Sequence, residues 1–134
     1  MANPSKAKGT RAETKVVRYL EAHGFTARRQ ALAGSDDQGD IEAYAPGSNS
    51  KLIIEVKTGK QTAAPSRSQI VEWCRQTKVE ATNAKGFPVL VVVRYRRELK
   101  DADVYFPGLF NREHWFFDDW VEFEGKFGKA FDVK

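Results

Sequence analysis

The hydrophobic pattern predicts three strands in the middle of the chain. The run FPVLVVVRY at 87–95 is almost continuously apolar and rich in valine, which is typical of a buried strand. The runs KLIIEVKT at 51–58 and DIEAY at 40–44 are shorter, and the turn sequence APGSNS separates them. A fourth, short strand is predicted at 104–106.

Two helices are predicted around these strands. Apolar residues at helical spacing predict a helix over about 8–23, and Gly24 follows as an end signal. A second helix is predicted over about 66–84, with Gly86 ending it. The order α-β-β-α-β-β predicts an α/β fold in which a central mixed sheet is flanked by helices.

The strand at 51–58 carries charges where a buried strand carries apolar residues. Side chains alternate between the two faces of a strand, so Glu55 and Lys57 share one face while Ile54 and Val56 lie on the other. One interpretation is an ion pair on a solvent-exposed face, which is worth under about 1 kcal/mol. The other is that this face carries a functional site and the opposite face carries the core.

Asp40 strengthens the second interpretation. It opens the strand at 40–44, and if the two strands pair as a hairpin it lies beside the Glu55 end of its partner. Two neighbouring carboxylates repel each other unless something neutralises them, and a divalent cation bound by oxygen ligands does so. The spacing leaves three competitors open for the role of Asp40: Asp36, Asp37 and Glu42.

Glu13 is a third irregularity. It shares the apolar face of the first helix with Val16 and Leu20, where a carboxylate is costly without a partner. It pairs either with a neighbouring cation at the rim of the core or with a metal ion that Asp40 and Glu55 also hold.

Composition narrows the possible classes. The 134 residues suffice for one domain, which we predict to span 1–134. One cysteine and two histidines exclude an internal disulfide and argue against structural zinc. No apolar run approaches the roughly 18 residues of a membrane span, and the first residues lack a secretory signal. We therefore expect a cytoplasmic protein with no membrane partner, encoded by a bacterium, an archaeon or a phage.

The net charge of +4 is unevenly distributed. Residues 1–30 hold seven Lys or Arg and two Asp or Glu, whereas residues 101–134 hold four and eight. This bias is either a solvated surface or the footprint of a polyanionic partner near the N-terminal part. Residues 1–8 are predicted to be a flexible basic arm, and RYRRELK at 94–100 is either a second basic patch or a solvated strand end.

The order of an acid in the first helix, a loop, GD at 39–40 and EVK at 55–57 resembles the PD-(D/E)XK nuclease superfamily. KGTRAETKVVRYLEAHGF and AGSDDQGDIEA resemble the opening helix and the following loop of its archaeal and phage Holliday junction resolvase branch. Glycine stands where the motif name has proline. The likeness covers about residues 8–60 and implies a restriction-endonuclease-like core.

This resemblance implies a DNA endonuclease that depends on Mg²⁺ or Mn²⁺. Glu13, Asp40, Glu55 and the backbone carbonyl of Val56 would ligate the metal, and Lys57 would orient or activate the attacking water. Ser35 matches a loop serine near the scissile phosphate. The remaining candidates are the DNA contacts Lys6, Lys8, Arg11, Arg28, Arg29 and Lys60, and Gln69 as a further site residue.

The aromatic residues bear on assembly. Ten of the sixteen lie between 105 and 131, so the segment 107–134 either packs onto the protein's own sheet or forms part of an oligomer interface. The resemblance implies a homodimer, because two symmetric strands of a junction are cut.

The predicted function is a Holliday junction resolvase that makes paired nicks in four-way DNA junctions. Alternatives within the superfamily are a flap, single-strand or restriction-like nuclease. Outside it, the competing hypotheses are a non-catalytic DNA-binding protein with the same fold and an interaction module for acidic partners.

Overall fold

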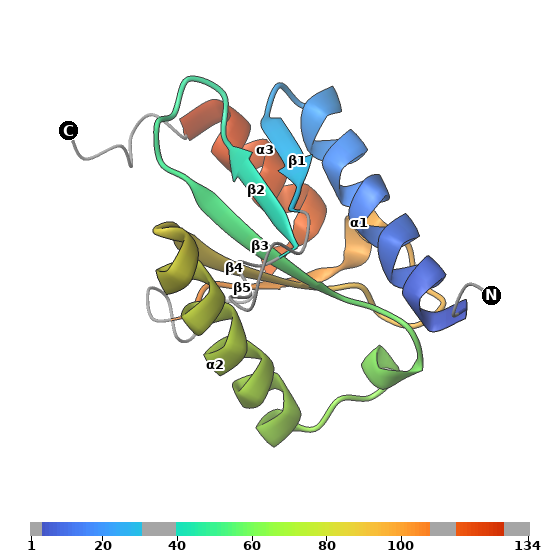
Figure 1. Ribbon diagram of the computed structural model, residues 1–134. Coiled ribbons are helices and arrows are strands. Elements are labelled where there is room, and N and C mark those ends of the chain that lie inside the picture. The colour runs from blue at the N-terminus through green and yellow to red at the C-terminus, as the bar shows by residue number, and fades with distance from the viewer. Residues whose placement is uncertain (1–3, 31–39, 108–114, 128–134) are drawn as a thin grey trace.

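The computed structural model describes residues 4–30, 40–107 and 115–127, which form a six-stranded sheet with helices on both faces (Figure 1). The strands lie in chain order across the sheet, with β3 parallel to β4 and the other neighbours antiparallel. The elements are α1 (Pro4–Ala22), β1 (Thr26–Arg29), β2 (Ile41–Tyr44), β3 (Leu52–Lys57), the 3-10 helix η1 (Lys60–Thr62), α2 (Arg67–Ala84), β4 (Phe87–Val92), the 3-10 helix η2 (Leu99–Asp101), β5 (Asp103–Tyr105), β6 (Trp115–Phe116) and α3 (Phe117–Phe127).

The larger part of the core lies between the sheet and the helices α1 and α3. Leu20 of α1 and Trp120 of α3 belong to one buried cluster with Ile54 and Val91 of the central strands. Figure 1 shows both helices on the same side of the sheet. Ile54 and Val56 therefore face the core, as their alternation with Glu55 predicts.

Helix α2 covers the other face. Trp73 packs with Leu90 and Val92 of β4, and Ala81 and Ala84 belong to a buried cluster with Ile53 of β3. This helix is the crossover that connects the parallel strands β3 and β4. Helix α2 thus covers the face of the sheet that carries Glu55 and Lys57.

The α/β fold with its mixed sheet is confirmed, but the predicted element order was incomplete. β1 was missed because TARR is mostly exposed at the sheet edge and has no apolar alternation. β6 was missed because it has only two residues. Helix α3 was also missed, although its buried residues Phe117, Trp120 and Val121 have helical spacing.

The first helix begins earlier than predicted. It starts at Pro4, because proline is well tolerated in the first turn, where its missing N–H has no helical partner. Residues 4–8, which we predicted to belong to a flexible basic arm, are therefore helical. Residues 1–3 lie outside the described part of the chain.

The aromatic tail divides between two environments. Phe117 and Trp120 are fully buried against the sheet, whereas Phe116 is 49% exposed. The remainder of the segment at 108–114 and 128–134 lies outside the described residues.

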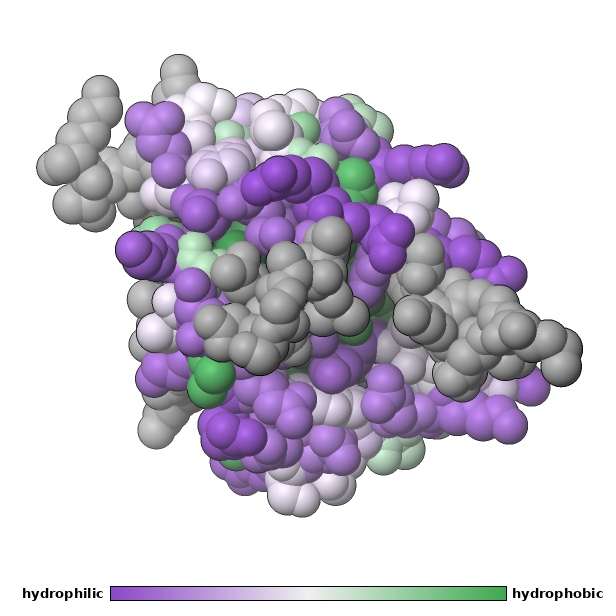
Figure 2. Space-filling view, viewed as in Figure 1, coloured by the Kyte–Doolittle hydropathy of each residue, from purple (hydrophilic) through white to green (hydrophobic). Residues whose placement is uncertain are grey.

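The face seen in Figure 2 is mainly hydrophilic, with few hydrophobic residues visible among the coloured atoms. No described helix has the length and apolar character needed to cross a membrane.

Gly86 fixes the approach of α2 to the sheet. The helix ends at Lys85 in the left-handed conformation, and the chain turns directly into β4. A Cβ at position 86 would lie 2.6 Å from Ile53 Cγ1 and 3.1 Å from the carbonyl oxygen of Lys51. The absence of a side chain therefore allows close contact with β3.

We expect Gly86→Ala to lower the free energy of unfolding by about 1 to 3 kcal/mol, because the added methyl group overpacks the contact with Ile53. Urea denaturation of both proteins measures the change. Equal midpoints and slopes would show that the backbone yields at this point without cost.

Candidate active site

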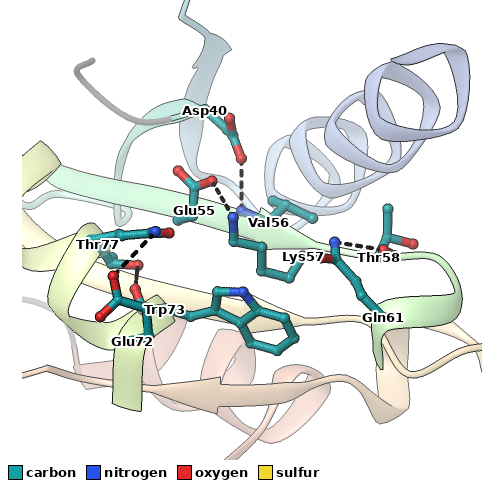
Figure 3. A network of polar contacts seen from close by, with 10 residues as sticks. Asp40, Glu55, Val56, Lys57, Thr58, Gln61, Glu72, Trp73 and Thr77 are labelled. Carbon is teal, nitrogen blue, oxygen red and sulfur yellow. Dashed lines mark hydrogen bonds and ion pairs between the residues drawn. The ribbon is translucent and has the colours of Figure 1, made fainter. Parts of the chain in front are cut away.

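Asp40 lies where β2 separates from β3. The last paired residues are Ile41 and Ile54, and the Asp40 N–H also donates to the Ile54 carbonyl at 3.2 Å. Beyond them, the Val56 N–H donates to Asp40 Oδ2 at 2.9 Å. The carboxylate takes the place of a backbone acceptor, and this holds it against β3 (Figure 3).

Glu55 and Lys57 point to the same face of β3, as the alternation predicts. The Lys57 Nζ atom lies 3.5 Å from Glu55 Oε1 (Figure 3). The ion pair of the simpler interpretation is present, but Glu55 is only 7% exposed, so this pair does not lie on a solvated face. The Glu55 carboxyl group and the Lys57 amino group are thus held together in a largely buried place.

Asp40 and Glu55 have pKa values far above the usual range of carboxyl groups. Burial raises the pKa of Asp40 to about 8, and the charges of Glu55 and Glu13 add to the effect while the Val56 N–H opposes it. Burial raises the pKa of Glu55 to about 9, with Lys57 opposing the increase. Burial is the largest cause for both groups, because it disfavours the charged form of a carboxyl group.

Glu80 contributes to the pKa shift of Glu55 and was missed in the sequence. It lies on α2, is 7% exposed, and raises the pKa of Glu55 through a hydrogen bond and through its charge. A signal was available, since Glu80 follows Thr77 and precedes Ala84 on the buried side of α2. An acid at a buried helix position is the same irregularity that singled out Glu13.

Glu13 reaches the site from α1 but is engaged elsewhere. Its Oε2 atom lies 2.9 Å from Nη2 and 3.0 Å from Nε of Arg29 on β1. It still acts on Asp40 electrostatically. Within the described residues, no group of three acids, cysteines or histidines is arranged to hold a metal ion. The structure therefore brings Asp40 and Glu55 together and leaves Glu13 in an ion pair nearby.

Asp40 and Glu55 nevertheless suit a divalent cation. Glu55 Oε2 is buried and has no hydrogen-bond partner among the described residues. A hard cation favours carboxylate oxygens and would stabilise their charged forms, which burial disfavours here.

Glu42, a sequence competitor of Asp40, has a different role. It lies on β2 with Arg28 Nε at 2.6 Å from its Oε2 and Lys51 Nζ at 3.4 Å from its Oε1. Lys51 also donates to the carbonyl of Ala84 at 3.2 Å, which connects the cluster to the end of α2. Asp36 and Asp37, the two acids of the preceding loop, lie outside the described residues.

The remaining candidates differ in their surroundings. Arg28 and Arg29, predicted to bind DNA, are in ion pairs with acids of this protein, whereas Arg11 and Lys60 are exposed. Gln69 is exposed in the first turn of α2, while Trp73 belongs to the core. Three candidates lie outside the part whose side chains are described: Lys6, Lys8 and Ser35.

A family model described as archaeal Holliday junction resolvase (Hjc) matches residues 4–113. The chain belongs to this family. It is therefore a junction-resolving nuclease, and the matched range contains all the acids described above together with Lys57. Hjc from Archaeoglobus fulgidus, a solved structure of a resolvase from an archaeal hyperthermophile, aligns with a TM-score of 0.52 at 22% identity. The alignment covers 84% of this chain and 89% of the other, which shows a shared restriction-endonuclease-like fold. No curated protein matches significantly.

We expect the metal-free protein to lose stability as pH rises from about 4 to about 9. The unfolded chain releases its carboxyl protons near pH 4, whereas folded Asp40 and Glu55 retain theirs until about pH 8 and 9. The favourable contribution is present below the unfolded pKa values and lost above the folded ones. Thermal unfolding in chelator across this range measures the effect.

Asp40→Asn is the matched variant for this test. It keeps an acceptor for the Val56 N–H and removes one charge, so it should raise the melting temperature at pH 8 and weaken the pH dependence. Added Mg²⁺ should stabilise the unmodified protein at pH 8 more than the variant. A melting temperature independent of pH in the unmodified protein would contradict the raised pKa values.

Proposed function

We propose that the chain is a divalent-metal-dependent endonuclease that makes paired nicks in four-way DNA junctions as a homodimer. The observation that carries this proposal is the meeting of Asp40, Glu55 and Lys57 at the end of β3. A binding protein has no need of two buried acids beside a lysine. The implied partner, junction DNA, agrees with the expected cytoplasmic location.

The metal would be Mg²⁺ or Mn²⁺. Asp40, Glu55 and the backbone carbonyl of Val56 would hold it, with Glu13 joining them once Arg29 releases its carboxylate. When bound, such an ion neutralises negative charge on the phosphate and lowers the pKa of a bound water.

The protein's own groups supply the remaining chemistry. Lys57 would place a fixed positive charge where negative charge develops on the phosphate and would orient the attacking water. Its ion pair with Glu55 holds the ammonium group at the site before substrate arrives. The Val56 N–H keeps the Asp40 carboxylate from rotating away. Ser35 would act near the scissile phosphate.

A homodimer suits the proposed cleavage of two strands in one junction. Paired nicks at symmetric positions need two active sites, and one chain contains one such site within its described residues. Part of the aromatic tail is used in the protein's own core, which leaves Phe116 as an exposed aromatic residue at the edge strand β6. We infer that Phe116 and the outer side of β6, the last strand of the sheet among the described residues, contact a second copy.

We expect Lys57→Ala and Glu55→Gln each to lower the cleavage rate of an immobile four-way junction by at least about 100-fold. Lys57→Ala removes a positive charge that acts on the reacting phosphate, and Glu55→Gln removes an anionic oxygen that would hold the metal. The assay compares the labelled junction with a linear duplex of the same arms, with Mg²⁺ and with chelator. Flap and single-stranded substrates test the other nuclease classes.

Glu42→Gln is the matched control for these variants. It replaces a buried acid on β2, next to the candidate site, that Arg28 and Lys51 hold in ion pairs. We expect it to keep the cleavage rate while costing some stability. Loss of cleavage in Glu42→Gln but not in Glu55→Gln would move the site to the other cluster. Metal-dependent cutting without preference for the junction would remove the resolvase part of the proposal.

The number of chains in the assembly is measured separately from cleavage. Sedimentation velocity at micromolar concentration should give a species of twice the chain mass of 15.1 kDa. The two nicks on one junction should then appear within the lifetime of a single complex. A monomer both alone and on the junction would contradict the homodimer.

A further inference from the structure

A basic groove lies beside the candidate active site. It has a volume of about 530 Å³ and lies between α1, the segment after β3 and the segment after β4. Figure 1 shows these three segments gathered near the N-terminal half of α1. Thr58 and Gly59 line it directly after Lys57, so the groove and the site are continuous along the chain. The charged residues in the lining are Arg11, Lys15, Arg94, Arg96, Arg97 and Glu98.

Most of this positive charge is not neutralised within the protein. Arg11, Lys15, Arg96 and Arg97 form no ion pair with any other described residue. They are all exposed. The two charged lining residues that do have partners carry opposite signs: Arg94 pairs with Asp103 at 2.6 Å and Glu98 with Lys100 at 3.6 Å. Four cations from two distant parts of the sequence thus converge on one concave surface.

Hydrogen bonds connect the segments that line the groove to β3, the strand that carries Glu55 and Lys57. The Val93 N–H donates to the Lys57 carbonyl at 2.8 Å. The buried Thr62 hydroxyl lies 2.7 Å from the carbonyl oxygen of Val93 and 2.8 Å from that of Gly59. These bonds fix the segments after β3 and β4 to each other. A solvated strand end, the simpler interpretation of RYRRELK, does not require such links.

The turn that presents the arginines is also fixed. The Arg97 N–H donates to the Arg94 carbonyl at 2.9 Å, and Arg96 lies in the left-handed region with φ 62°. Arg94 is anchored through its side chain to buried Asp103. The guanidinium carbon of Arg96 lies 5.1 Å from the centre of the Tyr95 ring, which limits its freedom. Arg96 and Arg97 are therefore presented from a defined backbone.

We propose that this groove binds the phosphate backbone of one arm of the DNA substrate, with Lys15, Arg96 and Arg97 as its contacts beyond the cleavage site. The proposal rests on the proposed function, because it assigns the path of the same substrate. Exposed cations on a fixed concave backbone bind a polyanion through its charge. Contacts to phosphate oxygens carry no sequence information, so binding through them is independent of sequence.

The test variant is Arg96→Asn with Arg97→Gln. Asparagine tolerates the left-handed backbone at position 96, and both replacements keep polar side chains. The matched control is Lys78→Gln with Lys85→Asn. It removes two positive charges from exposed positions of α2 and its C-terminal cap that form no ion pair with another described residue, and asparagine tolerates the left-handed backbone at position 85 as well. Lys15→Gln on α1 is a second, independent test in a different element. Circular dichroism and thermal unfolding establish that each variant folds.

Binding is measured by fluorescence anisotropy with a labelled immobile four-way junction and a linear duplex, in chelator, at several salt concentrations. Removing one cation that touches a phosphate should reduce the slope of log Kobs against log[salt] by about 1 and weaken binding about fivefold at about 0.15 M salt. The double variant should therefore reduce the slope by about 2 on both DNAs, and Lys15→Gln by about 1. The control should match the unmodified protein. In cleavage assays the double variant should raise KM and keep kcat at saturating junction.

The outcomes separate the two proposals. If the unmodified protein binds and cuts junctions but the groove variants keep its salt slope, the groove assignment is wrong and the proposed function stands. An equal loss in the α2 control would also overturn the groove, because net charge alone would then explain the effect. If the unmodified protein neither binds nor cuts junctions, both proposals fail.

Discussion

The hydrogen bond from the Val56 N–H to the Asp40 carboxylate is the contact on which the site depends. β3 is a central strand, and its N–H groups need acceptors even where β2 leaves it. An unpaired buried N–H costs roughly 1 to 3 kcal/mol, so a carboxylate there completes the sheet. The same contact holds Asp40 beside Glu55 in a place where burial raises the pKa of each carboxyl group. The fold thus positions the acids by satisfying its own backbone.

Ion pairs then determine which charges remain available. Arg28 and Lys51 hold Glu42, and Arg29 holds Glu13, so the basic residues of β1 are engaged by acids of the same protein. Lys57 is engaged by Glu55 within the site. Four cations of the groove have no such partners among the described residues: Arg11, Lys15, Arg96 and Arg97. Four unpaired positive charges therefore lie together in one groove next to the acids.

The two faces of β3 could be predicted from the sequence, because the alternation of side chains in a strand is a strict geometric rule. It placed Glu55 and Lys57 on one face and Ile54 and Val56 toward the core, as the structure has them. The rule does not say which layer covers a face, so Glu80 on α2 could not be paired with Glu55 in advance. The partner of Glu13 was missed because β1 itself was missed. A short, exposed edge strand is held by backbone hydrogen bonds and leaves little trace in the hydrophobic pattern.

The parallel pairing of β3 with β4 has a consequence for the synthesis of the chain. Glu13, Asp40, Glu55 and Lys57 have all been made once residue 57 has emerged, but β4 and α2 lie after them in the sequence. Until those elements are in place, Glu55 lacks its cover and Asp40 faces an unfinished sheet. A nascent chain thus carries all four candidate residues before it has the buried surroundings that raise the pKa values of Asp40 and Glu55. The candidate site is complete only when the crossover helix α2 and β4 have packed onto β3.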